Sequence, residues 1–74
     1  MYIGMAIVDG VMGRVFAADN LLSCKEAVTK DFIRRVGDLV PEEYDYLFVS
    51  YIGPSMQEEQ RWVFFTDTQL WTEV

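Results

Sequence analysis

The side chains that most often do chemistry in proteins are scarce in this 74-residue chain. It has no histidine and a single cysteine, Cys24, so a thiol nucleophile would lack its commonest base. Cys24 lies near the start of a predicted helix, whose dipole favours a thiolate, but a small, partly buried side chain is the simpler interpretation. Without histidines, a cysteine pair or a calcium-loop spacing, the chain offers no metal site. We expect no catalytic residues, no metal and no cofactor.

Two pairs of adjacent acids, Glu42-Glu43 and Glu58-Glu59, are the other residues that could do acid–base work. Neighbouring residues usually point apart, and both pairs fall in predicted loops, so solvated loop acids are the simpler interpretation. The sequence therefore predicts a protein that is not an enzyme.

The acidic residues are unevenly distributed. Twelve Asp and Glu against six Lys and Arg give a net charge of −6. Residues 1–37 carry a net charge of +1, whereas residues 38–74 carry −7 with Arg61 as their one basic residue. Such a surface repels nucleic acid and attracts basic partners. We expect the partner to be a protein with a basic surface, with no direct contact to nucleic acid and none to a membrane.

A lone cysteine cannot form an internal disulfide and suits a reducing compartment. The first apolar run ends at Asp9 and has no basic residues before it, which is atypical of a signal peptide or a membrane span. We expect a cytoplasmic protein with one domain over residues 1–74, since neither a repeat nor a linker divides the chain.

Asp9-Gly10 separates two apolar runs, Tyr2–Val8 and Val11–Ala18, and predicts a β-hairpin with a type I′ turn. In that register Val8 lies opposite Val11. Large side chains then share one face and small side chains the other. The large-residue face has Ile3, Met5, Ile7, Met12 and Phe16, interrupted by Arg14.

A helix is predicted to begin at Cys24, because Ser23 and Glu26 fit a capping box. Its apolar stripe runs along one face, with favourable charge pairs from Glu26 to Lys30 and from Asp31 to Arg35. Gly37 is the predicted stop. One amphipathic helix of this kind packs on a sheet.

A connector with Pro41 leads to a predicted strand at Tyr44–Ile52, followed by a polar loop of eight residues from Gly53 and a strand at Arg61–Thr66. Residues 67–74 fit either a short edge strand or a helical turn. The predicted fold is α+β: a small two-layer ββαββ domain whose antiparallel sheet has one amphipathic helix packed on one face.

Both faces of this sheet are apolar, and one helix covers only one of them. The second face is covered by the C-terminal segment with Leu70 and Trp71, by a second copy of the chain, or by a different protein. In the last two cases aromatic residues are the natural anchors, since they dominate interface energetics. The predicted anchors are Tyr46, Phe48, Trp62 and Trp71.

The predicted topology sorts the acids of residues 38–74 into two groups at opposite ends of the long strands, up to about 30 Å apart at ~3.3 Å per residue. Two such groups could imitate a row of phosphates and occupy a basic groove, although ordinary solubilising charge explains them equally well. The predicted partner-binding acids are Asp38, Glu42, Glu43, Asp45, Glu58, Glu59 and Asp67.

In size and charge the chain is similar to the small acidic inhibitors that bacteriophages encode against restriction, CRISPR or transcription machinery, a likeness that rests on no specific residues. The leading hypothesis is a non-enzymatic protein-binding module of this inhibitor type, which occupies a nucleic-acid-binding surface of its partner. The alternative is a homo-oligomeric structural or accessory protein that dimerises through the uncovered sheet face.

Overall fold

The computed structural model describes residues 1–37, 45–66 and 68–74 of the chain. Strands alternate with turns along most of the described chain, and one helix separates the first three strands from the last three. The elements in chain order are β1 (Tyr2–Val8), β2 (Val11–Met12), β3 (Phe16–Ala18), α1 (Leu21–Val36), β4 (Tyr46–Ile52), β5 (Glu58–Phe65) and β6 (Leu70–Glu73).

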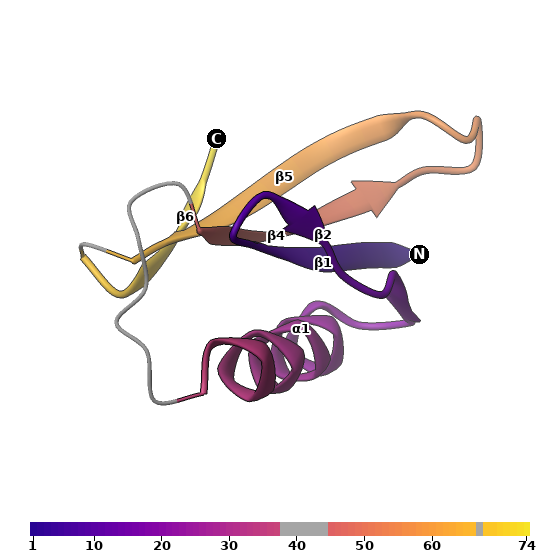
Figure 1. Cartoon of the computed structure of the whole chain (residues 1–74). Coiled ribbons are helices and arrows are strands. Elements are labelled where there is room, and N and C mark those ends of the chain that lie inside the picture. Colours follow the sequence, from indigo (N-terminus) through magenta and orange to yellow (C-terminus); the bar gives the residue numbers. More distant parts are fainter. Residues whose placement is uncertain (38–44, 67) are drawn as a thin grey trace.

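The strands form one antiparallel sheet in the order β2-β1-β4-β5-β6, and β3 also pairs with β1. Helix α1 lies across one face of this sheet, and no other described element lies over the opposite face (Figure 1). The predicted α+β architecture with one helix on one face is confirmed. The sheet has six strands rather than four, because the second predicted strand is divided and the C-terminal segment adds a strand.

The first hairpin turns as predicted at Asp9 and Gly10, whose φ angles of 54° and 75° are both positive. Val8 pairs with Val11, which confirms the predicted register. After Met12 the register shifts by one residue, and Gly4 pairs with Phe16. The prediction that Phe16 shares the large-residue face is therefore wrong: Phe16 packs against the core on the helix side.

The shift occurs where Arg35 of α1 reaches the hairpin. Its Nη1 donates to the carbonyl of Ala6 at 2.8 Å and its Nη2 to the carbonyl of Val11 at 2.6 Å. The backbone N–H of Gly13 donates to the same Ala6 carbonyl at 2.9 Å. A side chain at Gly13 would collide with the Arg35 guanidinium, so glycine is needed where the chain leaves β2.

Helix α1 begins three residues earlier than predicted. Asn20 is its N-cap, and the Asn20 side chain accepts a hydrogen bond from the backbone N–H of Ser23 at 2.8 Å. The predicted role of Ser23 as the cap is wrong, because Asn20 already supplies the acceptor that the first turn needs. The helix ends at Val36, and Gly37 adopts a φ of 62°, as predicted for the stop.

The core lies between α1 and the sheet. Gly4 permits the close approach of the two layers, since a Cβ there would lie 2.7 Å from Cγ2 of Val28. Aromatic side chains from β3, β5 and β6 pack around the core without being fully buried. The buried apolar residues are Ala6, Cys24, Val28, Phe32, Val36, Leu47 and Val49.

The last three strands differ from the prediction at their ends. Strand β4 begins at Tyr46, after Asp45, while Tyr44 and the predicted connector lie outside the described residues. Strand β5 begins at Glu58, so the preceding loop is shorter than predicted and Glu58 and Glu59 lie in a strand. Of the two predictions for the C-terminal segment, the edge strand is confirmed as β6, which pairs with β5.

Candidate protein-binding face

The sheet face turned away from α1 is lined mostly by apolar side chains. Met5 pairs with Phe48 and Phe48 with Val63, so these three side chains form one row across β1, β4 and β5. Neighbouring rows follow from the same register, which pairs Ile7 with Tyr46 and Phe65 with Leu70. We name this surface the open face; its apolar residues are Ile3, Met5, Ile7, Tyr46, Phe48, Val63, Phe65 and Leu70.

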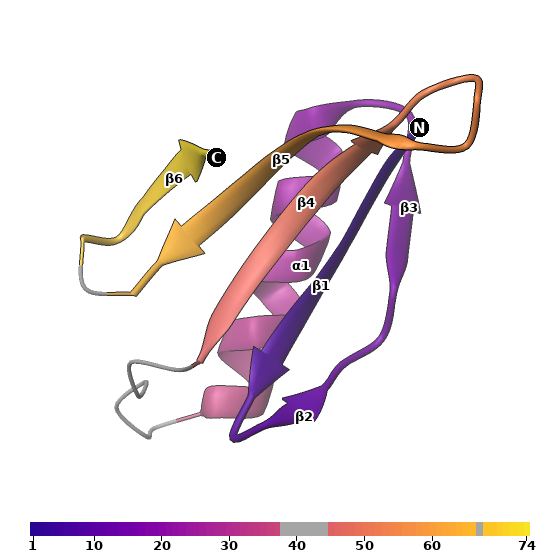
Figure 2. The ribbon, with the colours of Figure 1, turned by 90° about the horizontal axis from the view of Figure 1, so that it is seen from above.

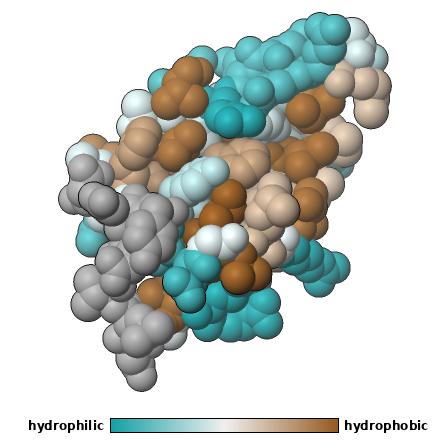
Figure 3. All heavy atoms as spheres, turned by 45° about the horizontal axis from the view of Figure 1, so that its top comes forward, coloured by the Kyte–Doolittle hydropathy of each residue, from teal (hydrophilic) through white to brown (hydrophobic). Residues whose placement is uncertain are grey.

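These apolar side chains are only partly shielded from solvent. Leu70 is 64% exposed, Phe65 42% and Tyr46 38%, and the others on the open face are half-buried by their neighbours in the sheet. Figure 3 shows the apolar residues across the middle of this face, with hydrophilic residues along one edge. A contiguous apolar surface of this kind is typical of a site that binds another protein.

The four predicted aromatic anchors do not share one face. Tyr46 and Phe48 lie on the open face, with their ring centroids 6.3 Å apart. Trp62 and Trp71 lie on the helix side, where both pack against the core. The prediction of a common surface is wrong for the two tryptophans, because their register partners Val49 and Phe64 face α1.

The C-terminal segment does not cover the open face. It lies in the plane of the sheet as β6, with Leu70 on the open face and Trp71 on the helix side. The alternative in which Leu70 and Trp71 fold back over the sheet is therefore wrong.

One end of the open face carries a polar cluster that the sequence interpretation missed. Oε1 of Glu58 accepts a hydrogen bond from Oγ of Ser50 at 2.5 Å and from Nε of Arg61 at 2.7 Å. The Arg61 guanidinium lies 4.9 Å from the centroid of the Phe48 ring, within cation–π range. The hydrogen bonds from Ser50 and Arg61 lower the pKa of Glu58. Strand alternation puts Phe48, Ser50 and Arg61 together once the β4–β5 register is known.

The predicted partner-binding acids differ in their burial and in whether the structure describes them. Asp45 is 5% exposed, and its Oδ1 accepts a hydrogen bond from the backbone N–H of Asp9 at 2.8 Å, so it closes the first hairpin instead of facing a partner. Glu58 and Glu59 are both exposed, at the start of β5. The other four acids lie outside the described residues: Asp38, Glu42, Glu43 and Asp67.

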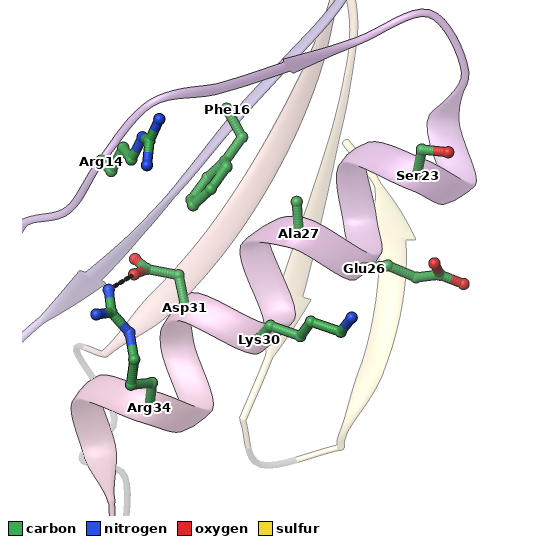
Figure 4. A pocket seen from close by; sticks show the side chains of 8 residues that line it. All are labelled: Arg14, Phe16, Ser23, Glu26, Ala27, Lys30, Asp31 and Arg34. Atoms are coloured by element: carbon green, nitrogen blue, oxygen red, sulfur yellow. Dashed lines mark hydrogen bonds and ion pairs between the residues drawn. The ribbon is translucent and has the colours of Figure 1, made fainter.

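A recess on the helix side collects charged residues of both signs. It has a volume of about 520 Å³ and lies between α1 and the segment with Arg14 and Phe16 (Figure 4). Asp31, 3% exposed, binds Arg34 through Oδ1 at 2.6 Å. Among the described residues no group donates a hydrogen bond to its Oδ2, which lies 3.7 Å from Nη1 of Arg35. This inner oxygen is itself buried from solvent, so a ligand in the recess would meet the exposed charged side chains around it instead.

Within residues 1–37, 45–66 and 68–74, no group of three or more acids and cysteines is placed to hold a metal ion. In the part of the chain that the structure describes, helix α1 is too short and too polar to cross a membrane.

The chain matches no protein-family model, and it has no significant match among curated proteins or solved structures.

Proposed function

We propose that the chain is a non-enzymatic protein-binding module that docks its open face on a partner protein with a basic surface. The observation that carries the proposal is the row of partly exposed apolar residues opposite α1, with Phe48 at its centre. Aromatic side chains at the centre of such a surface, surrounded by polar groups that exclude water, are typical of binding hot spots. Arg61 and Glu58 supply a polar rim at one end.

The charge of the chain favours a basic partner. A net charge of −6 raises the association rate with a positively charged surface and opposes binding to nucleic acid. Proteins that handle nucleic acid have such surfaces, and an acidic chain bound there would compete with the phosphate backbone. We therefore propose an inhibitor of a nucleic-acid-handling protein. The lone cysteine, Cys24, supports the cytoplasm as its compartment, since it leaves no internal disulfide to form.

The open face is tested by capture from cell extract with matched variants. Phe48→Ser and Phe65→Ser each remove an aromatic side chain from the open face, and we expect each to weaken retention of the partner by about tenfold or more. Met56→Ser is the control, because Met56 is 78% exposed but lies in the β4–β5 loop, away from this face. Retention of the same partner by all three variants would exclude the open face as the binding surface.

The electrostatic part needs a separate variant. Reversal of Glu42, Glu43 and Glu59 to lysine should weaken capture strongly, and capture by the unmodified chain should fall as salt rises. Asp45 is left unchanged in this variant because it is buried and holds the first hairpin. Unchanged affinity in the charge-reversed variant would contradict the proposal that the partner surface is basic. It would not affect the proposal that the open face is the binding surface.

A second candidate function is a homodimer through the same face. It is favoured by the pairing of Arg61 with Glu58, since these opposite charges let two copies meet face to face without an unpaired charge at that contact. Light scattering at micromolar concentration separates the two candidates. A dimer that Phe48→Ser dissociates supports self-association, and a monomer at every concentration excludes it.

A further inference from the structure

A second apolar surface lies on the helix side of the sheet, between α1 and β6. Two adjoining recesses, of about 480 Å³ and about 300 Å³, share Thr29 of the helix and form one groove. The walls carry apolar side chains of α1, and the floor carries aromatic side chains of β5 and β6. We name it the α1–β6 groove; its main apolar residues are Leu22, Ile33, Phe64 and Trp71.

The groove exists because α1 covers only part of its sheet face. Among the described residues, the backbone of α1 approaches β1, β3 and β4 but neither β5 nor β6. Figure 2 shows β6 lying to one side of the helix. Leu22 and Ile33, which point along this side of α1, are consequently 66% and 62% exposed. Exposed leucine and isoleucine on a helix beside an exposed sheet indicate a missing neighbour.

The spacing of the elements fits a second helix. Helix α1 lies over β1, with β3 and β4 on its two sides, and β5 is two strands away from β1, about 9.6 Å at ~4.8 Å per strand. Packed helices lie about 8–10 Å apart, so a helix over β5 would contact α1 directly. From Leu22 to Ile33 the groove follows α1 for about 16 Å, at ~1.5 Å per residue, or about three helical turns.

A second copy of this chain is a poor occupant. Its α1 already uses its apolar stripe on its own sheet, and the outward side of that helix carries the exposed charged residues Glu26, Lys30 and Arg34. Burial of these charges against Phe64 and Trp71 would be costly. The occupant must bring an apolar stripe of its own.

The rims of the groove set the charges of that occupant. On the α1 side, Lys25 and Lys30 border the groove with Glu26 between them, and Nζ of Lys25 lies 5.4 Å from the centroid of the Trp71 ring. Glu73 pairs with Trp62 and is an exposed acid on the helix side of β6, two residues beyond Trp71. A helix with acids on the flank toward α1 and bases on the flank toward β6 would match both rims.

We propose that the α1–β6 groove binds an amphipathic helix of a partner protein, with its apolar stripe on Trp71 and Phe64 and its acidic flank beside Lys25. This surface lies on the opposite side of the sheet from the open face, so the chain can hold two partner segments at once. The proposal does not depend on the open face being a binding site.

The probe is a synthetic peptide of about 16 residues, which exceeds three helical turns. It has leucines at helical spacing, glutamates along one flank and lysines along the other. Titration into the ¹⁵N-labelled chain, followed by NMR, should give saturable shifts of the Trp71 indole N–H and the Leu22 amide. Trp71→Ala should weaken binding by about tenfold, as expected for truncation of an aromatic anchor.

Matched variants make the result decisive. Leu22→Gln changes an exposed groove residue that the fold does not need, and should weaken binding, whereas Phe65→Ala on the open face should not. Lys25→Glu should weaken this peptide and favour one with the two charged flanks exchanged. The proposal is overturned if no saturable shift appears at peptide concentrations up to about 1 mM, which corresponds to a binding free energy of about −4 kcal/mol. It is equally overturned if the shifts map to the open face. Binding of the same peptide in an extended conformation along the edge of β6 would also overturn it.

Discussion

Arg35 fills the space that a side chain on Gly13 would need. The guanidinium passes beneath the first hairpin and donates to the carbonyls of Ala6 and Val11, at 2.8 Å and 2.6 Å. One side chain of α1 thus fixes how β2 leaves β1 and how the register changes before β3. Strand β1, which this contact joins to α1, contributes Ile3, Met5 and Ile7 to the open face.

Gly13→Ala should destabilise the fold by about 1–3 kcal/mol, the usual cost of overpacking a filled site. The added methyl group collides with a guanidinium that two hydrogen bonds hold in place. Urea denaturation measures the change. In an Arg35→Ala background the same substitution should cost less, since the nearest obstacle is gone while Oδ2 of Asp31 at 2.9 Å and the Ala6 carbonyl at 3.0 Å remain. Equal costs in the two backgrounds would show that Gly13 is needed for another reason.

Arg35→Gln should destabilise the chain much more than Arg34→Gln, although both arginines lie near Asp31. The Arg34 side chain is 77% exposed while its partner Asp31 is buried, so loss of this single hydrogen bond should cost about 1.5 kcal/mol. The Arg35 side chain is 20% exposed, and its loss leaves two carbonyls and a buried carboxylate oxygen without their cation, at a cost of about 3 kcal/mol. Thermal denaturation of the two variants compares them. A larger loss from Arg34→Gln would contradict this assignment.

Asp45→Ala should destabilise the fold by about 1 kcal/mol, because it removes the acceptor of a partly buried hydrogen bond from the backbone N–H of Asp9. Glu59→Ala is the control, an exposed acid of the same half of the chain, and it should change stability by less than about 0.5 kcal/mol. Hydrogen exchange of the Asp9 amide gives a direct reading: it should accelerate in the Asp45 variant alone. Slow exchange in that variant would show that another group protects the turn.

The pKa of Glu58 should rise when Arg61 or Ser50 is replaced by alanine, because their hydrogen bonds stabilise its ionised form. Since the pKa in the folded state is lowered, the contribution of Glu58 to stability is present above its unfolded pKa and is lost as pH falls through the folded pKa. NMR titration of the Glu58 carboxyl carbon measures the shift. In Glu58→Gln, stability should depend less on pH in this acidic range. An unchanged Glu58 pKa in both alanine variants would contradict the cluster.

Local features of the sequence determined much of the fold. Asp9-Gly10 fixes the first turn, because both residues tolerate the positive φ angles that it needs. The apolar stripe of α1 and the glycine at position 37 fix the helix and its end. Alternation along β4 and β5 separates each strand into two sets of side chains. Each of these features acts over a few residues, so the chain alone reveals it.

The tertiary structure alone decided which set faces the helix. Leu47 and Tyr46 are both plausible core residues by type, and so are Trp62 and Val63, since both sets are apolar. Packing of α1 against Gly4 and Ala6, the small-residue side of β1, selects Leu47 and Trp62 for the helix side and leaves Tyr46 and Val63 on the open face. Contacts between residues far apart in sequence therefore determine which side chains of β4 and β5 face α1. The register shift beside the Arg35 contact likewise puts Phe16 on the helix side with the core.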